Sequence, residues 1–135
     1  MNAPRFLLDT NICIYIARHK PAAVLARFQK LRTGEAVVSV ITYGELQFGA
    51  AKSRDARSAR AALDEFSSLV AVLPLPAAAA DCYGAMRASL EQRGLPIGGN
   101  DLWIAAHAQA AELVLVTNNE NEFRRIPDLK TQNWV

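Results

Sequence analysis

The sequence is poor in cysteine and in aromatic residues, and it has no long apolar segment. Its two cysteines, Cys13 and Cys82, belong neither to a CxxC pair nor to a spacing typical of metal ligands. A disulfide framework and a zinc site are therefore excluded, and both thiols are expected to be reduced. No apolar run approaches the roughly 18 residues that a membrane span needs. Because Asp9 interrupts the first apolar run, we expect no secretory signal and a cytoplasmic location.

Two nucleotide-binding signatures, GxGxxG and GxxxxGK, are also missing, which excludes the common dinucleotide and P-loop sites. Apolar residues make up 51% of the 135 residues, and 24 of them are alanine. A chain of this length buries roughly 65–70% of its extended surface when it folds. We therefore expect residues 1–135 to form one domain in which helices pack closely.

The net charge of +2 conceals an uneven distribution. Residues 1–60 contain ten Lys and Arg against four Asp and Glu, whereas residues 61–135 contain five against nine. A basic half beside an acidic half is compatible with a nucleic-acid partner near an acidic site. The distribution alone does not establish that function.

Short apolar runs alternate with helical patterns along the chain. Residues 5–8, 36–40, 69–73 and 113–116 have the composition of buried strands, and residues 132–135 are a candidate edge strand. Helical patterns fill the intervals, including a long helix opened by Pro76 and another from Leu102 to about Ala111. The alternation predicts a three-layer α/β/α sandwich around a central, mostly parallel sheet of four to five strands.

Acidic residues follow the ends of these predicted strands. Asp9 follows the first strand, Glu45 lies one turn into the helix after the second, and Asp101 opens a later helix. Glu120 and Glu122 follow the fourth strand. Each position has a structural explanation on its own: Asp9 and Asp101 as N-caps, Thr42 and Glu45 as a capping box, and Glu122 as part of a first helical turn.

Taken together, the acids indicate a metal site. Helices that follow parallel strands begin at the same edge of the sheet, where open α/β proteins bind ligands. Three or four carboxylates at that edge repel one another unless a cation neutralises them. Oxygen ligands without a cysteine or histidine set favour Mg²⁺ or Mn²⁺, which commonly serve phosphoryl chemistry.

Four stretches carry a family resemblance. They are residues 7–11 (LLDTN), 39–46 (SVITYGEL), 96–108 (PIGGNDLWIAAHA) and 116–123 (VTNNENEF), and Trp134 closes the pattern. In order and spacing the chain resembles PIN-domain ribonucleases, in particular the VapC toxins of bacterial toxin–antitoxin pairs. The resemblance runs essentially from end to end.

The resemblance implies roles for individual residues. Asp9, Glu45 and Asp101 take the positions of the family's metal-binding acids. Glu122 takes the fourth position, where the family often has Asp, and Glu120 is the competing candidate. The residues that match the polar groups orienting the cluster are Asn11 and Thr117. By the same resemblance, this acidic site is expected to bind Mg²⁺, with Mn²⁺ able to substitute.

The resemblance also implies the activity and the partners. The expected reaction is metal-dependent hydrolysis of an RNA phosphodiester, leaving a 5′-phosphate and a 3′-hydroxyl. Relatives with these motifs act on tRNA, often at the anticodon loop of the initiator tRNA. A VapB-type antitoxin and a homodimer are expected too. The apolar residues Ile41, Leu46 and Phe48 could supply such interfaces, and burial in the core explains them equally well.

RNA contacts are expected from the basic half. Arg54, Arg57 and Arg60 recur at every third residue, and Lys52 precedes them. A stripe of this kind tracks phosphates in some proteins and is an ordinary solvated face in others. We interpret His107 and Trp103 as structural residues, and His19 as a surface or capping residue.

Other functions fit the sequence less well. A phosphatase of the haloacid dehalogenase type needs a second aspartate at the position of Asn11, and a receiver domain needs paired acids there and a lysine near Asn118. The remaining alternative is a PIN fold without activity that binds RNA or protein. The complete set of Asp9, Glu45 and Asp101 argues against it.

Overall fold

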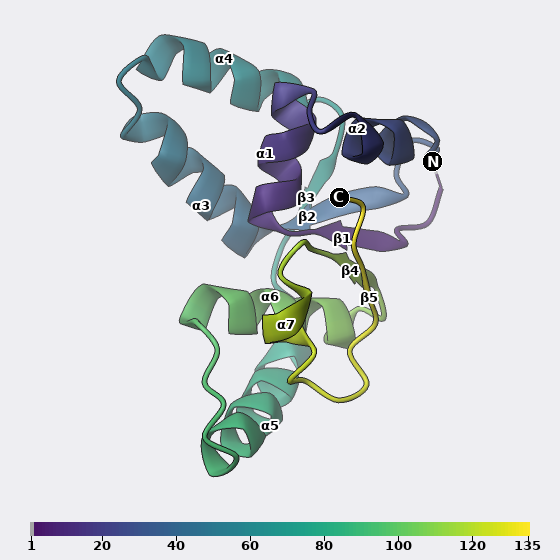
Figure 1. Ribbon diagram of the computed structural model, residues 1–135, viewed down its shortest axis with the longest axis vertical. Coiled ribbons are helices and arrows are strands. Elements are labelled where there is room, and N and C mark those ends of the chain that lie inside the picture. Colours follow the sequence, from purple (N-terminus) through teal and green to yellow (C-terminus); the bar gives the residue numbers. More distant parts are fainter. Residues whose placement is uncertain (1) are drawn as a thin grey trace.

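The computed structural model describes residues 2–135, which form a parallel sheet with helices on both faces (Figure 1). In the described chain the sheet has five strands in the order β3-β2-β1-β4-β5, and every neighbouring pair is parallel. The strands are β1 (Phe6–Leu8), β2 (Ala36–Ser39), β3 (Ala71–Leu73), β4 (Val114–Val116) and β5 (Thr131–Gln132). The predicted α/β/α sandwich is thus confirmed, with a fully parallel sheet.

Helices cover the two faces in separate groups. They are α1 (Thr10–Arg18), α2 (Ala22–Gln29), α3 (Val40–Ala51), α4 (Ala56–Ser67), α5 (Ala78–Gln92), α6 (Gly99–Ala110) and α7 (Glu120–Phe123). Figure 1 shows α1 to α4 on one side of the sheet and α5 to α7 on the other. None of the helices in residues 2–135 is both long and apolar enough to cross a membrane.

Alternation along the strands explains the two layers. Leu7 of β1 belongs to the core formed with α5, α6 and α7, whereas its neighbours Phe6 and Leu8 belong to the core formed with α1, α2 and α4. Successive side chains of a strand point to opposite faces, so a strand that is apolar throughout must be covered on both. The helices on each side therefore hold the strand ends, and the residues that follow them, in fixed positions.

Some predicted boundaries and caps are wrong. The helix expected from Leu102 begins at Gly99, which places Asp101 in its first turn and not at its N-cap. The capping box at Thr42 does not form, because Ser39 caps α3 and accepts a hydrogen bond from the Ile41 N–H. Thr42 is instead buried, and within residues 2–135 its hydroxyl has no hydrogen-bond partner. The cap is Ser39 because β2 ends at Ser39 and α3 begins at the next residue, Val40.

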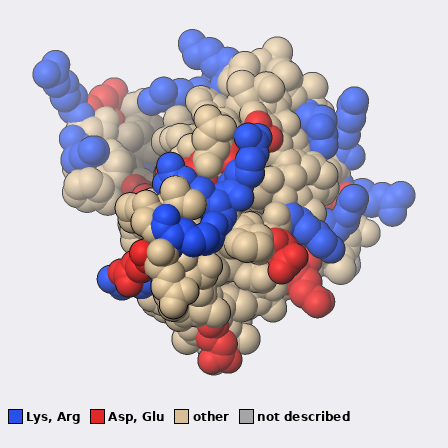
Figure 2. All heavy atoms as spheres, turned by 60° about the horizontal axis from the view of Figure 1, so that its bottom comes forward, with Lys and Arg blue, Asp and Glu red and all other residues tan. Residues whose placement is uncertain are grey.

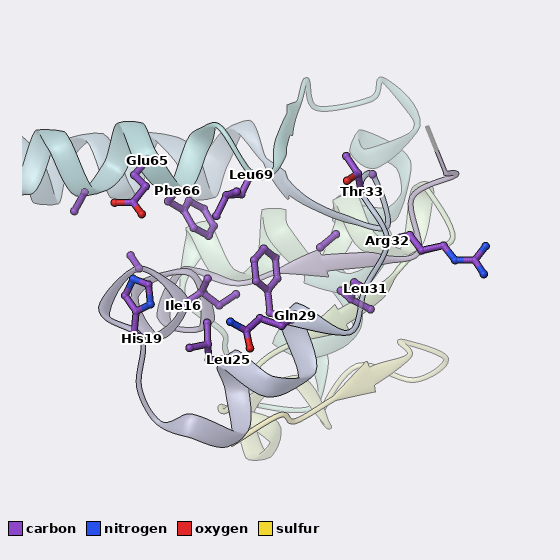
Figure 3. A pocket seen from close by; sticks show the side chains of 15 residues that line it. Ile16, His19, Leu25, Gln29, Leu31, Arg32, Thr33, Glu65, Phe66 and Leu69 are labelled. Atoms are coloured by element: carbon purple, nitrogen blue, oxygen red, sulfur yellow. The ribbon is translucent and has the colours of Figure 1, made fainter.

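One cavity lies away from these strand ends. It has a volume of about 310 Å³ and is bounded by Ala36, the first residue of β2, so it opens at the opposite edge of the sheet. Figure 3 shows Ile16, Leu25 and Phe66 pointing into it from α1, α2 and α4. Its lining is largely apolar and contains none of the predicted catalytic acids.

Candidate active site

The predicted acids meet where the order of the strands reverses. β1 and β4 are neighbours at the centre of the sheet, and the chain continues from β1 towards β2 on one side and from β4 towards β5 on the other. Open α/β sheets bind ligands at such a switch point, outside the carboxyl ends of the strands. Asp9 follows β1 and Thr117 follows β4, so both lie at this point.

Asp9 is held by the start of α1. Its Oδ1 accepts the Ile12 N–H at 3.0 Å, and the side chain is only 6% exposed. Burial raises the pKa of the Asp9 carboxyl, and the nearby Glu45 carboxylate raises it too. Hydrogen bonds from the Thr117 side chain and from the Ile12 and Asn11 N–H groups lower the pKa. Asp9 therefore acts as an N-cap and, at the same time, stands beside other carboxylates.

Glu45 reaches the same place from α3. The Thr10 hydroxyl donates a hydrogen bond of 2.7 Å to its Oε1, which joins α1 to α3 directly beside Asp9. Because Glu45 contributes to the raised pKa values of both Asp9 and Asp101, its carboxylate lies close to each of them. The residue that fixes it, Thr10, belongs to the first motif but was given no role in the sequence analysis.

Asp101 and Glu122 complete the group. Partial burial is the largest cause that raises the pKa of Asp101 to about 7, followed by the charge of Glu122 and a hydrogen bond with it. Glu45 and Asp9 add smaller contributions in the same direction. A hydrogen bond between two carboxyl groups requires that one of them carries the proton. Asp9, Glu45 and Glu122 all lie within electrostatic reach of Asp101, and these four residues are named below as the acidic cluster.

Glu120 lies outside this cluster. It accepts a hydrogen bond from the Asn133 side chain at 3.4 Å, whereas Glu122 faces Asp101 and accepts one of 2.7 Å from Asn119. Of the two candidates for the fourth acid, the structure brings Glu122 to the cluster and not Glu120. Thr117 orients the cluster by bonding Asp9 and accepting the Asn119 N–H. Asn11 offers Asp9 its backbone N–H, and its side chain is exposed.

The donor chemistry of the cluster fits a hard divalent cation. Four carboxylates supply only oxygen ligands, and the raised pKa of Asp101 shows that their charges are not balanced by protein groups. Within residues 2–135, however, no group of three or more Asp, Glu, His or Cys side chains is already arranged to hold a metal ion. Glu45 accepts a hydrogen bond from Thr10 and Glu122 accepts one from Asn119, so these side chains would have to reorient to bind a cation together with Asp9 and Asp101.

The predicted RNA-binding residues lie where α3 meets α4. Lys52, Arg54 and Arg57 are exposed, and Arg60 is half-buried and bonds the Gln47 side chain of α3. Arg60 is therefore partly engaged within the protein. In the view of Figure 2, basic side chains cross the centre of the face, next to acidic ones, and stand around its upper rim.

Two residues interpreted as structural are packed inside the protein. His107 is 1% exposed and bonds Ser39, and burial lowers its pKa. Trp103 is half-buried and stacks on Tyr83 of α5, with ring centroids 3.9 Å apart. His19 ends α1 in the left-handed conformation and is exposed.

Comparisons with known proteins identify a family that matches nearly the whole chain. The PIN-domain family profile matches residues 6–129. A tRNA(fMet)-specific endonuclease VapC of Shigella flexneri is 43% identical over 130 residues, which cover 96% of this chain and 98% of that protein. Ribonuclease VapC2 of Haemophilus influenzae is 40% identical, with 97% and 98% covered.

Solved structures show the same similarity. VapBC2 of Rickettsia felis, bound to promoter DNA, contains a chain that is 40% identical and superposes with a TM-score of 0.90, covering 96% of this chain and 98% of that one. DNA-bound VapBC of Salmonella typhimurium gives 40% identity and a TM-score of 0.91, with 98% and 99% covered.

Proposed function

The chain belongs to the PIN-domain family, among its VapC ribonucleases, and on this basis we propose that it is a toxin that cleaves RNA with the help of a divalent cation. The observation that carries the proposal is the acidic cluster at the switch point of the sheet. A site of partly buried, mutually repelling carboxylates is unsuited to bind RNA by itself, because the phosphates are anionic as well. A cation bound between the carboxylates and an RNA phosphate would offset the negative charge of both.

Asp9, Glu45, Asp101 and Glu122 would hold this cation, Mg²⁺ or Mn²⁺. When bound, it would supply Lewis-acid stabilisation of the phosphate charge and activation of water. Because the pKa of Asp101 is raised to about 7, its carboxyl group must lose its proton before it can serve as a ligand. Asp9 is already held by Ile12 and Thr117, and Glu45 is held by Thr10. Orienting these two carboxylates during the reaction therefore costs little free energy.

We assign tRNA as the substrate class. The support is the similarity to VapC proteins of Shigella flexneri and Salmonella typhimurium that are named tRNA(fMet)-specific endonucleases. Lys52, Arg54 and Arg57 supply positive charge at the α3–α4 turn, where they would contact phosphates and not bases. Recognition of one tRNA would then depend on its shape as well as on its sequence.

The partners would be a VapB-type antitoxin and a second copy of the chain. The solved relatives from Rickettsia felis and Salmonella typhimurium are VapBC complexes. On α3, Val40 and Phe48 are 42% and 65% exposed, an apolar surface that a homodimer would cover. Sedimentation of the purified toxin tests the dimer, and a Phe48→Asp variant should sediment as a monomer. A wild-type monomer at micromolar concentration would refute it.

The proposed activity is tested with purified protein, initiator tRNA, total tRNA and an unrelated structured RNA. Cleavage is expected with Mg²⁺ or Mn²⁺, and it should stop with a chelator and in Asp9→Asn. Asp64→Asn, an exposed acid on α4, is the matched control and should retain activity. Cleavage that survives the chelator and Asp9→Asn would refute the metal mechanism. If folded protein binds RNA but cleaves none of these substrates, the chain is the inactive binding module.

A further inference from the structure

A groove begins at the acidic cluster and runs along α1. It has a volume of about 420 Å³ and lies between α1, α3 and α4. Thr10 and Glu45, which bond each other, line one end of it. Arg18 and Lys52, at or just after the far ends of α1 and α3, line the other. The groove therefore connects the carboxylates to two cationic side chains.

The groove is apolar between these two ends. Its lining includes the buried side chains of Cys13, Leu63 and Phe66, together with the half-buried Ile14 and Leu46. A ligand that fills it must therefore carry apolar surface in its middle. The cations at the far end are available to that ligand, because within residues 2–135 neither Arg18 nor Lys52 is part of an ion pair. Lys52 lies over the Phe48 ring, with its Nζ 5.0 Å from the ring centroid.

We propose that this groove binds the nucleotide next to the scissile phosphate of a single-stranded RNA segment. The base would lie against the apolar walls, and the following phosphate would be bound by Arg18 and Lys52. The inference rests on the proposed ribonuclease function. A nucleotide combines a base whose flat faces are apolar with an anionic phosphate. The base therefore suits the apolar walls of the groove, and the phosphate suits Arg18 and Lys52 at its far end.

The dimensions agree with such an occupant. Thr10 and Arg18 are eight residues apart on α1, which is about 12 Å along the helix axis. A volume of about 420 Å³ is at the lower end of the range for small-ligand sites, which suits one nucleotide and not a folded element. An apolar protein segment would fill the middle of the groove but would leave Arg18 and Lys52 without an anionic partner.

Gly49 allows the groove to be blocked without disturbing the acidic cluster. It lies on the groove wall, and a Cβ at this position would meet no atom within 4 Å. A larger side chain there would project into the groove. Gly84 of α5 is the matched control, because it is exposed, lies outside the groove and also has open space at its Cβ position. Both are helical glycines, so replacing them does not oppose the backbone conformation.

The experiment compares Gly49→Leu with Gly84→Leu. Their KM and kcat are measured with tRNA, and their affinity for RNA is measured in an Asp9→Asn background that leaves the RNA intact. We expect Gly49→Leu to raise KM and to weaken RNA binding about tenfold or more, because the base loses its binding surface. The Gly84→Leu variant should stay within about twofold of the wild type, as expected for a distant surface site.

A second variant keeps the proposal testable if Gly49→Leu does not fold. Arg18→Ala should weaken RNA binding and reduce the slope of its salt dependence by about one, since one phosphate contact is lost. Normal KM, affinity and salt slope in these variants would overturn the groove proposal while wild-type cleavage upheld the ribonuclease function. Normal cleavage combined with loss of antitoxin inhibition would assign the groove to the antitoxin instead. If the wild type neither binds nor cleaves RNA, the proposed function fails, and the groove proposal fails with it.

Discussion

Ser39 and His107 join the two helices that carry Glu45 and Asp101. The Ser39 Oγ lies 2.8 Å from the His107 Nδ1, and it also accepts the Ile41 N–H at the start of α3. The direction of this bond depends on which ring nitrogen carries the proton, because the Ser39 hydroxyl can donate to Nδ1 or accept from it. Burial lowers the pKa of His107 and so favours the neutral ring. The bond thereby couples the N-terminus of α3 to α6.

Replacing His107 should therefore cost stability. His107→Ala removes a fully buried ring and leaves the Ser39 hydroxyl without its partner, for an expected loss of about 3 kcal/mol in the free energy of unfolding. His107→Asn retains an amide that can donate to or accept from the Ser39 hydroxyl, and it should recover part of that loss. Urea denaturation measures both variants. Equal losses in the two variants would show that packing, and not the hydrogen bond, matters at this position.

The pKa of Asp101 predicts how stability changes with pH when no cation is bound. Because the folded-state pKa is about 7 against an ordinary 3.8, the folded protein binds this proton more tightly than the unfolded chain. The resulting stabilisation is complete below pH 3.8 and disappears as the pH rises through 7. In a chelator, the melting temperature of the wild type relative to Asp101→Asn should fall over this window.

Addition of Mg²⁺ above pH 7 should reverse that decline in the wild type and have little effect on Asp101→Asn, because a bound cation stabilises the folded state by mass action. The comparison with Asp101→Asn is needed because the lowered pKa of His107 acts in the opposite direction. That residue favours unfolding as the pH falls below its ordinary value of 6.5. If the melting temperatures of the wild type and of Asp101→Asn changed in parallel with pH, the raised pKa could not belong to Asp101.

The two glutamates of the last motif should differ sharply in their importance. Glu122→Gln removes a charge that faces Asp101 and should lower kcat about 100-fold or more, as expected when a group acting on the transition state is lost. Glu120→Gln, two residues away, should change kcat by less than about threefold. Single-turnover cleavage of tRNA measures both. A larger loss in Glu120→Gln than in Glu122→Gln would reverse the assignment of the fourth acid.

The two threonines that hold the carboxylates should control cation affinity. Thr10→Val removes the donor to Glu45, and Thr117→Val removes the donor to Asp9, while both keep the shape of the side chain. We expect either substitution to weaken Mn²⁺ binding about 10- to 100-fold, as is typical of residues that orient metal ligands. Calorimetric titration gives this affinity without any RNA. Thr131→Val, in β5, is a control and should bind Mn²⁺ normally.

Much of the fold could be predicted because it depends on local patterns. Apolar runs on both faces indicated parallel strands, and the motif order indicated which acids follow them. The contacts that tune the site are not local: Thr10 and Glu45 are 35 positions apart, and Ser39 and His107 are 68 apart. Tertiary packing decides such pairs, so the motif alone indicates no role for Thr10, and the cap predicted at Thr42 does not form.

The strand order also determines when during synthesis the site can exist. Asp9 lies in the first tenth of the chain, but its side chain bonds Thr117, which follows β4, and its neighbour Asp101 faces Glu122 in α7. Because β4 is inserted beside β1 only after nearly all the other elements have been made, an incomplete nascent chain has an N-terminal aspartate but no assembled site. The topology thus delays assembly of the proposed catalytic site until translation is almost finished.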